Sequence, residues 1–286
     1  MTDLLFKNIK LIDCNEIEII DDISEGGQGE VYKAKYFNKF VVIKRFKQKL
    51  KSFELKELVA YVKLKHPLMV EFYGYFIDDD EKLNLVLEYA DGYILNDLIS
   101  SEALNYTQKI QIIQDLANIL LYFKENHTLH RDLKPDNIIV NIIDKDTVKL
   151  KILDFGICKI TDKSIVTLSN NAMSIQYCPP ESLQTNVKGN YKYDIWSFGL
   201  IIAYLFSEKL PWGKASNIQI EYKLVKKEPY PIPTNIDNIN IIKLIKLCTK
   251  IVPDDRIAPE GLVYLISILK RKKNITSEDI DHALIR

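Results

Sequence analysis

The sequence predicts an α+β protein with two lobes, a small lobe built on an antiparallel sheet and a larger lobe made mainly of helices. Up to about residue 90, short runs rich in Ile, Val, Tyr and Phe alternate with turn residues, a pattern typical of paired strands. Beyond that point, apolar residues recur at three- and four-residue spacing, which is typical of helices. With 286 residues, 47% of them hydrophobic, the chain can bury a sizeable core.

The small lobe is expected to combine strands with one main helix. Residues 17–50 predict a β-hairpin and a third strand that ends near Phe46. In residues 52–65, apolar side chains return every three or four positions, so this segment predicts a helix that stops before a His-Pro pair. Residues 70–77 and 83–89 predict two further strands.

The larger lobe is expected to follow a short hinge at 88–92, with a cleft between the lobes. Thr107 is predicted to cap the first long helix. Residues 194–206 are apolar on almost every side of a helix, which predicts a central helix surrounded by other elements. Thr276 is predicted to cap a final helix.

Composition excludes several classes of partner. Thirty-nine basic residues balance thirty-nine acidic ones, so we expect no binding to nucleic acid or to an anionic membrane. Four scattered cysteines predict neither a zinc site nor a disulfide framework, and the longest apolar run, about 199–206, is too short to span a bilayer. No secretory signal is visible, so we expect a cytoplasmic protein, with a nuclear location left open by the basic run 270–273.

Residues 23–31, ISEGGQGEV, predict a glycine-rich turn between two strands. Gly26, Gly27 and Gly29 would let backbone amides approach a phosphate group without intervening side chains. An ordinary flexible hairpin explains this segment equally well by itself. The following strand brings Lys44 beside the hairpin, although an isolated strand lysine is usually just solvated.

Residues 130–137, HRDLKPDN, give a more specific signal, because Asp132, Lys134 and Asn137 lie close together on a predicted loop. Five fixed residue types at fixed offsets arise by chance in roughly one chain of this length in ten thousand. An Asp-Phe-Gly triplet that begins at Asp154 follows a strand-like run and strengthens the signal.

With these motifs in this order, the sequence resembles the eukaryotic protein kinases of the serine/threonine type. Glu57 resembles the helix glutamate that pairs with the strand lysine, and Glu181 ends a segment that resembles the Ala-Pro-Glu motif. Asp194 opens a segment similar to the start of the buried kinase helix, and Arg256 resembles the arginine that pairs with Glu181. The resemblance implies a bilobal kinase fold. The implied parts are an N-terminal extension (1–16), the small lobe (17–87), the hinge (88–92), the larger lobe (93–269) and a C-terminal extension (270–286).

The resemblance implies transfer of the ATP γ-phosphate to Ser and Thr hydroxyls of protein substrates. Lys44, braced by Glu57, would hold the α- and β-phosphates. Asp132 would accept or orient the hydroxyl proton, and Lys134 would reach the γ-phosphate. The implied metal ligands are Asn137 and Asp154. They would bind Mg²⁺, or Mn²⁺ instead of Mg²⁺. The residues expected around the nucleotide are Ile23, Ser24, Gly26, Gly27, Gly29, Val31, Val42, Lys44, Glu88, Ala90 and Ile139.

The sequence departs from the family pattern at a few positions. Ser24 replaces the first glycine of the loop, Val42 replaces an alanine under the adenine, and Ser174 replaces a threonine. None of these changes removes a catalytic group. Lys134 favours serine/threonine specificity over a tyrosine or dual-specificity kinase. The sequence also leaves open a kinase-shaped binding protein without turnover and a small-molecule phosphotransferase.

The segment between Asp154 and Glu181 contains several hydroxyl residues, among which Ser169 and Thr167 are the favoured phosphorylation sites. A phosphate there would be neutralised by Arg131 and could order the segment. An upstream kinase or a second copy of the protein would add it. Ordinary polar loop residues explain these hydroxyls equally well.

Overall fold

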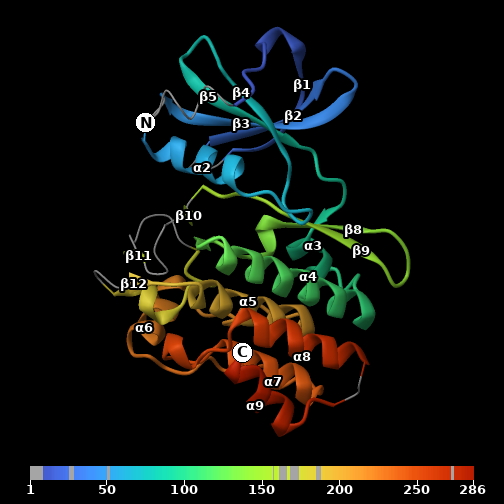
Figure 1. Cartoon of the computed structure of the whole chain (residues 1–286), viewed down its shortest axis with the longest axis vertical. Coiled ribbons are helices and arrows are strands. Elements are labelled where there is room, and N and C mark those ends of the chain that lie inside the picture. The colour runs from blue at the N-terminus through green and yellow to red at the C-terminus, as the bar shows by residue number, and fades with distance from the viewer. Residues whose placement is uncertain are drawn as a thin grey trace. The chain divides into compact units, whose positions relative to one another are not determined.

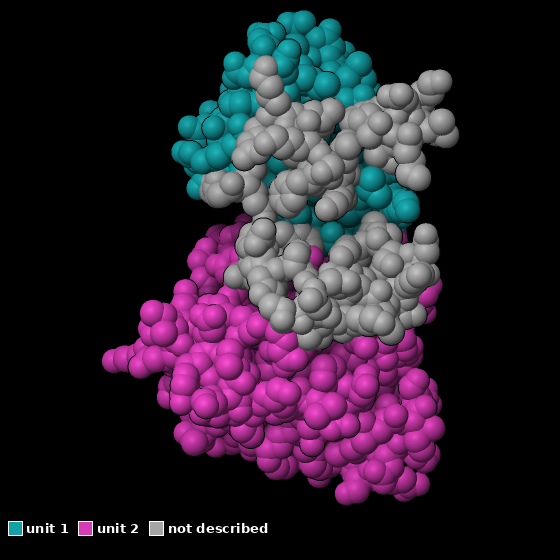
Figure 2. Space-filling model, turned by 90° about the vertical axis from the view of Figure 1, so that its left-hand side faces the viewer, with its two compact units in different colours: residues 1–91, 151–158 teal, residues 92–150, 159–286 magenta. Residues whose placement is uncertain are grey.

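The computed structural model describes residues 9–25, 29–49, 52–156, 158–160, 166–167, 174–184, 188–271 and 274–286. The chain forms two compact units (Figure 2). Unit 1 consists of Met1–Asp91 and Lys151–Cys158, and unit 2 of Gly92–Leu150 and Lys159–Arg286. The predicted α+β class is confirmed, because unit 1 is built on an antiparallel sheet and unit 2 is mainly helical.

Unit 1 holds a five-stranded antiparallel sheet with the strand order β1-β2-β3-β5-β4 (Figure 1). Its elements are β1 (Ile17–Glu25), β2 (Gly29–Tyr36), β3 (Lys39–Lys49), helix α2 (Ser52–Lys63), β4 (Phe72–Ile77) and β5 (Lys82–Glu88). The third strand runs on to Lys49, three residues beyond the predicted end, and the remaining elements lie where the sequence patterns predict them.

The register of this sheet separates two faces. Lys44 pairs with Val31 across β2 and β3, and Val42 lies two residues before Lys44 on the same strand. Since side chains alternate along a strand, Val31, Val42 and Lys44 share one face. The opposite face carries a buried apolar cluster of Ile12, Ala34, Val41, Ile43, Phe76 and Val86.

A segment before β1 completes that cluster. The Ile12 N–H donates to the Tyr75 carbonyl at 2.8 Å, and the Tyr75 N–H donates to the Lys10 carbonyl at 3.0 Å. Ile12 is only 2% exposed. A Cβ on Gly74 would lie 2.4 Å from the Lys10 carbonyl oxygen, so the close approach of this segment to β4 requires glycine there.

Unit 2 is organised around helix α5 (Lys192–Ser207), which is buried along nearly its whole length, as predicted. A Cβ on Gly199 would lie 2.6 Å from Cys248 Cβ, so glycine lets α5 and α7 pack closely. The other helices are α3 (Leu95–Ser100), α4 (Tyr106–Glu125), α6 (Asn217–Val225), α7 (Ile239–Cys248), α8 (Pro259–Arg271) and α9 (Ser277–Ile285).

Short strands and 3-10 turns connect these helices. The strands are β6 (Tyr93–Ile94), β7 (Thr128–Leu129), β8 (Ile138–Ile142), β9 (Val148–Ile152), β10 (Lys159–Ile160), β11 (Val166–Thr167) and β12 (Lys188–Gly189). The 3-10 turns of unit 2 are η2 (Pro135–Asn137), η3 (Pro180–Leu183) and η4 (Pro253–Asp255), while η1 (Cys14–Glu16) precedes β1 in unit 1. Within the described parts of the chain, no helix has both the length and the apolar character needed to cross a bilayer. All four cysteines are free thiols.

The predicted cap at Thr107 is wrong. Helix α4 begins two residues earlier than this cap implies. Its N-cap is Asn105, whose side chain accepts from the Gln108 N–H while the Gln108 side chain accepts from the Asn105 N–H. Asn105 is the N-cap instead of Thr107 because a glutamine lies three residues after it and completes this reciprocal pair of hydrogen bonds. The predicted cap at Thr276 is confirmed, since its side chain accepts from the Asp279 N–H at 3.1 Å.

Candidate active site

Unit 1 gathers three of the charged residues selected from the sequence. Lys44 lies on β3, Glu57 lies on α2 and Asp154 follows β9. The Lys44 ammonium donates to Glu57 Oε1 and to Asp154 Oδ1, each at 2.7 Å. The expected lysine–glutamate ion pair is therefore present, and the same lysine also contacts the aspartate that was expected to bind metal.

These buried charges depend on one another. The side chains of Lys44 and Glu57 are 9% and 0% exposed. Burial by itself lowers the pKa of Lys44, but the Glu57 and Asp154 carboxylates outweigh burial and hold that pKa above its ordinary value. Burial raises the pKa of Glu57, and Lys44 opposes this shift. Among the described residues, Glu57 Oε2 has no hydrogen-bond partner, so Lys44 is the main support of this carboxylate.

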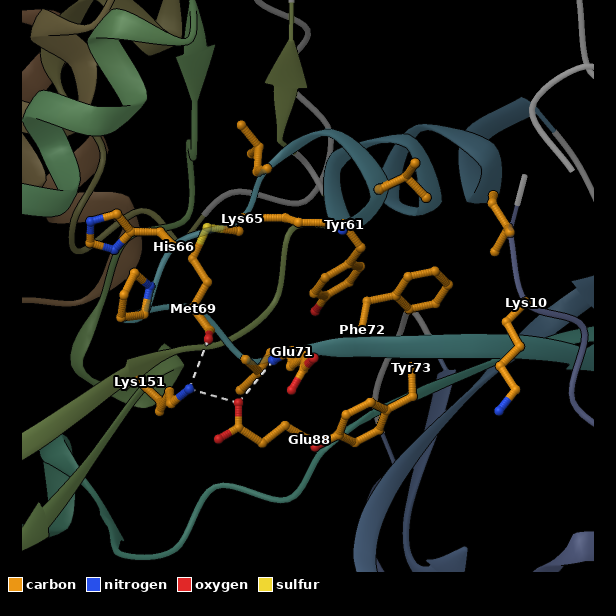
Figure 3. A pocket seen from close by; sticks show the side chains of 15 residues that line it. Lys10, Tyr61, Lys65, His66, Met69, Glu71, Phe72, Tyr73, Glu88 and Lys151 are labelled. Carbon is orange, nitrogen blue, oxygen red and sulfur yellow. Dashed lines mark hydrogen bonds and ion pairs between the residues drawn. The ribbon is translucent and has the colours of Figure 1, made fainter. Parts of the chain in front are cut away.

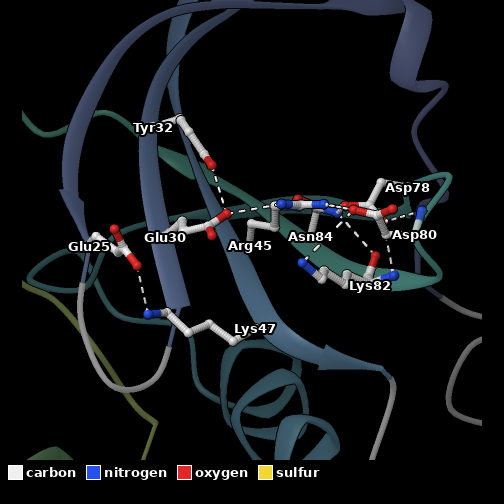
Figure 4. A network of polar contacts seen from close by, with 9 residues as sticks. All are labelled: Glu25, Glu30, Tyr32, Arg45, Lys47, Asp78, Asp80, Lys82 and Asn84. Atoms are coloured by element: carbon white, nitrogen blue, oxygen red, sulfur yellow. Dashed lines mark hydrogen bonds and ion pairs between the residues drawn. The ribbon is translucent and has the colours of Figure 1, made fainter.

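A polar network anchors β3 next to Lys44 (Figure 4). Arg45 Nε donates to Asp78 at 2.6 Å, while its two terminal nitrogens donate to Glu30 at 3.0 Å and to Asp80 at 2.5 Å. Because neighbouring strand residues point to opposite faces, this network holds the strand from the side opposite Lys44. It ties β3 to β2 and to the turn between β4 and β5.

The backbone before Asp154 is held within the same unit. The Ile152 N–H donates to the Leu68 carbonyl at 2.7 Å, and the Val70 N–H donates to the Ile152 carbonyl at 3.3 Å. Asp154 itself has a left-handed φ of 53°, a conformation that costs a non-glycine residue about 1–2 kcal/mol. Asp154 Oδ1 accepts from the Gly156 N–H at 2.9 Å, which helps to fix this geometry.

Glu88, which the sequence analysis expects in a hinge, directs its side chain into a pocket of about 530 Å³ within unit 1 (Figure 3). Glu88 Oε2 accepts from Lys151 Nζ at 2.7 Å and from the Glu71 N–H at 2.9 Å. The Glu88 N–H donates to the Glu71 carbonyl at 2.8 Å. Because its side chain and its N–H are both engaged, Glu88 would contact adenine through its backbone carbonyl oxygen. Sequence reasoning missed Lys151, and no local pattern points to its pairing.

Unit 2 holds the second cluster, which is centred on Asp132. Ser174 Oγ donates to Asp132 Oδ1 at 2.9 Å, and Lys134 Nζ lies 2.9 Å from Asp132 Oδ2. The Asn137 amide nitrogen donates to Asp132 Oδ2 at 3.0 Å and to the Asp132 carbonyl at 2.8 Å. Lys134 also donates to Ser174 Oγ at 2.7 Å. Three side chains thus fix the orientation of the Asp132 carboxylate.

The loop that carries Asp132 is fastened to the buried helix α5. Asp194 accepts from the backbone N–H groups of His130 and Arg131 at 2.8 and 2.9 Å. Arg131 has a left-handed φ of 71°, so these bonds hold a strained backbone just before Asp132. Burial raises the pKa of Asp194, against the opposing effect of these N–H donors and of His130. From the sequence, Asp194 was expected only at the start of a helix, and no local pattern points to its bonds with this backbone.

The expected pairing of Glu181 and Arg256 is confirmed. The two terminal nitrogens of Arg256 donate to the two carboxylate oxygens of Glu181 at 2.6 and 2.7 Å. The Arg256 guanidinium also lies 5.1 Å from the centre of the Trp196 ring on α5. This buried pair fixes the segment after Ser174 to the core of unit 2.

The remaining expected nucleotide residues fall into two groups. In unit 1, Val31 and Val42 are half-buried on the Lys44 face, Ala90 is buried, and Ile23 and Ser24 lie exposed on β1. Gly29 is required by packing, because a Cβ there would lie 2.3 Å from the Arg45 carbonyl oxygen. In unit 2, Ile139 lies half-buried on β8. The positions outside the described residues are Gly26, Gly27, Ser169 and the side chain of Thr167.

Comparisons with known proteins agree with this geometry. A probable serine/threonine-protein kinase of Clostridium perfringens is 30% identical over 233 residues, which cover 78% of this chain and 33% of that protein. The serine/threonine-protein kinase cds1 of Schizosaccharomyces pombe is 27% identical over 263 residues, 88% of this chain and 56% of that protein. The cysteine-rich receptor-like protein kinase 24 of Arabidopsis thaliana is 30% identical over 291 residues, 92% of this chain and 45% of that protein.

The chain thus spans between a third and just over half of the length of these relatives. Residues 17–264 match the family description of the protein kinase domain, and this match covers both the Lys44 cluster and the Asp132 cluster. The chain therefore belongs to the protein kinase family.

Proposed function

We propose that the protein transfers the γ-phosphoryl group of ATP to serine and threonine hydroxyls of protein substrates. The observation that carries this proposal is the state of Asp132, whose carboxylate is oriented by Lys134, Asn137 and Ser174 at 2.9–3.0 Å. A carboxylate held in this way is suited to orient a hydroxyl group and to accept its proton. Family membership supports ATP and a protein as the two substrates.

The Lys44 cluster fits the phosphate end of a nucleotide. The Lys44 ammonium is buried, charged and braced by Glu57, so it can hold α- and β-phosphate oxygens in a fixed place. Val31 and Val42 on the same sheet face offer an apolar surface for adenine. In this role Glu57 and Asp154 together hold the Lys44 ammonium in place.

The family resemblance implies one metal ligand in each unit, Asp154 in unit 1 and Asn137 in unit 2, and each carries an oxygen of the kind that a divalent ion such as Mg²⁺ prefers. Asp154 offers a carboxylate that is 31% exposed, and Asn137 uses its amide nitrogen toward Asp132, which leaves its amide oxygen for a metal. Mg²⁺ prefers hard oxygen ligands of this kind together with phosphates and waters. When bound, the metal–nucleotide complex supplies the transferable phosphoryl group and neutralises part of its charge.

The other residues of unit 2 support the transfer. Lys134 lies beside Asp132 and Ser174 and can place positive charge next to the γ-phosphate. Serine/threonine specificity is supported by Lys134 and by the bacterial and yeast relatives, which are named serine/threonine-protein kinases. We further propose activation by phosphorylation at Ser169 or Thr167; full activity of a phosphatase-treated sample, unchanged by preincubation with ATP, would contradict it.

Radiolabelled ATP and a generic protein substrate test the proposed transfer. The wild type is expected to label serine and threonine, while Lys44→Met and Asp132→Asn each lower the rate by at least about a hundredfold, because they remove phosphate binding and hydroxyl orientation. Lys149→Met, a change at an exposed lysine on β9, is the matched control. Label on tyrosine alone would refute the specificity, and nucleotide binding without any transfer would favour a scaffold protein.

A further inference from the structure

The hairpin formed by β2 and β3 ends in an exposed aromatic turn. Tyr36 and Lys39 pair across the two strands, so Phe37 and Asn38 form a two-residue turn. Phe37 is 67% exposed, and Phe40, just after the turn, is 53% exposed. The end of the hairpin therefore carries two large apolar side chains that are mostly open to solvent.

Phe37 also has an unfavourable backbone conformation. Its φ is 50°, in the left-handed region that bulky residues rarely adopt. Glycine, asparagine or aspartate usually occupies such a turn position, since these residues reach it at lower cost. Phe37 contacts Tyr36, at 4.7 Å between ring centres, but this contact leaves it largely exposed. Strain that is kept at an exposed position points to a role outside the packing of the fold.

The charges next to the turn are mainly positive. Lys35 and Lys39 are exposed, and residues 33–46 contain no Asp or Glu. Lys35 shares a face with Phe40, its partner across the ladder. Lys39 directly precedes Phe40, so it lies on the opposite face, and the two lysines flank the turn from both sides. Across the ladder on β1, Glu18 is the partner of Lys35 and offsets part of its charge.

Two further lysines lie over aromatic rings near the turn. The Lys33 ammonium lies 4.6 Å from the centre of the Phe40 ring and 4.5 Å from the centre of the Tyr89 ring. The Lys10 ammonium lies 5.2 Å from the centre of the Tyr36 ring and donates to the Tyr36 hydroxyl at 2.8 Å. Four lysines therefore accompany the exposed rings at this end of the sheet.

Exposed rings flanked by lysines match the surface of an anionic lipid bilayer. There, apolar side chains enter the boundary between headgroups and acyl chains while lysines contact the anionic headgroups. Single-stranded nucleic acid would instead need open ring faces on which bases stack. In the hairpin, ammonium groups already occupy ring faces, as Lys33 does for Phe40 and Tyr89. The bilayer is therefore the better match.

We propose that the β2–β3 hairpin binds the surface of an anionic lipid bilayer and inserts Phe37 into it. The Phe40 ring follows at the edge of the headgroup layer, and Lys35 and Lys39 contact the anionic headgroups. The zero net charge of the whole chain predicts no membrane binding, but an ammonium group acts on charges within about 8 Å, so the local surface decides. Lys44 lies four residues beyond Phe40, roughly 13 Å along the strand, so the hairpin turn is separate from the Lys44 cluster.

Co-sedimentation with lipid vesicles tests the binding. The wild type is expected to bind vesicles of phosphatidylcholine with about 30% phosphatidylserine, more weakly as salt rises, and not to bind vesicles of phosphatidylcholine alone. Phe37→Asn should lower the partition coefficient about tenfold, because it removes the inserted ring. Lys35→Gln combined with Lys39→Gln should lower it about twentyfold, from about fivefold for each lysine. Asparagine tolerates a left-handed φ, so Phe37→Asn should unfold at no lower urea concentration than the wild type.

Tryptophan fluorescence tests the insertion. Phe37→Trp places an indole ring at the turn, and vesicles that contain brominated phosphatidylcholine together with phosphatidylserine should quench its emission. Trp196 and Trp212 are 0% and 8% exposed, so they contribute a background that the vesicles leave unchanged. Ile285→Trp on α9, at a position that is 85% exposed, is the matched control and should show no quenching.

Lys149→Gln on β9 and Ile285→Ser on α9 are the controls for binding, and both should keep the wild-type partition coefficient. The proposal is refuted if the wild type does not bind anionic vesicles, if the hairpin variants bind as tightly as the wild type, or if Phe37→Trp is not quenched. A changed oligomeric state of Phe37→Asn with unchanged vesicle binding also refutes it, in favour of a contact between copies. Loss of polyuridylate binding by the hairpin variants, without loss of vesicle binding, refutes it in favour of nucleic acid. These assays contain no ATP, so their outcome is independent of the proposed function.

Discussion

The two clusters hold their carboxylates in different ways. In unit 1, Glu57 is fully buried, and the charge of Lys44 is its main support. In unit 2, Asp132 is held by three neutral or charged donors, and its loop is fastened to α5 through Asp194. Removing one partner from a buried ion pair leaves an uncompensated charge, whereas removing one donor from a network leaves others in place. The fold of unit 1 should therefore depend more strongly on its site residues.

The largest effect is expected for Glu57→Ala. It removes one of the two carboxylates that balance the buried Lys44 ammonium and leaves only Asp154, so we expect a loss of about 2–4 kcal/mol in the free energy of unfolding. Phosphotransfer should fall by at least about a hundredfold because Lys44 is no longer held in place. Urea unfolding and steady-state kinetics measure the two effects. Glu25→Ala, which breaks the exposed pair with Lys47, should cost less than about 0.5 kcal/mol; equal losses for the two variants would remove the contrast.

A smaller loss of stability is expected for Asp194→Asn in unit 2. An asparagine can accept only with its one oxygen, so the amides of His130 and Arg131 lose part of their support, at a cost of about 1–3 kcal/mol. The turnover number should fall at least about tenfold, because the backbone before Asp132 relaxes. The KM for ATP should change little, since Lys44 lies in the other unit. Exposed Asp255→Asn is the control, and a large rise in the KM for ATP would contradict this separation.

Asp115 on α4 sharpens the comparison, because it is a half-buried carboxylate with weaker support than Glu57. Burial raises the pKa of Asp115 to about 6, and only Lys270 opposes the shift. A carboxyl group whose pKa is higher in the folded state than in the unfolded state lowers stability as the pH rises from about 4 through 6. Asp115→Asn should therefore raise the free energy of unfolding at pH 7 by about 1–2 kcal/mol, with the gain vanishing near pH 3.5.

Urea unfolding between pH 3.5 and pH 8 measures this difference. Asp281→Asn, at an exposed position of α9, should show no comparable pH-dependent gain. A gain for Asp115→Asn that is the same at every pH would show that something other than the carboxyl charge is responsible.

The smallest effect is expected for Arg45→Lys in the surface network of unit 1. Three carboxylates surround the guanidinium and raise the pKa of Arg45, against the opposing effect of burial. A lysine cannot reproduce the fork geometry, so we expect a loss of about 1 kcal/mol in the free energy of unfolding. Exposed Arg271→Lys on α8 is the control. A loss as large as that of Glu57→Ala would mean that this network, and not the buried pair, dominates unit 1.

Much of the fold could be predicted from local patterns. The strands of unit 1 follow from short β-branched and aromatic runs, and the buried helix α5 follows from apolar residues on almost every side. The pairs Lys44–Glu57 and Glu181–Arg256 were implied by motifs whose spacing is characteristic of the family, and both pairs are present. Local composition was sufficient for the strands and for α5, whereas the two ion pairs were expected only through the family resemblance.

Other features depended on partners that lie far away in the chain. Ile12 was placed in an extension, yet it packs into the sheet core against residues more than twenty positions away. The cap of α4 was misplaced for a local reason instead: the reciprocal bonds of Asn105 with Gln108, three residues on, outweigh the hydroxyl preference for Thr107. Periodicity shows that a residue is buried, but it does not name what covers it.

From the sequence alone came the residue types, the strand and helix periods and the order of motifs that carry the chemistry. The tertiary structure alone decided that Asp194 holds the strained backbone at Arg131 and that Lys151 pairs with the side chain of Glu88, and it showed which carboxylate oxygen of Asp132 receives the Ser174 hydroxyl. These contacts join residues more than forty positions apart. Their geometry is set by how whole elements pack, which no local pattern of residues encodes.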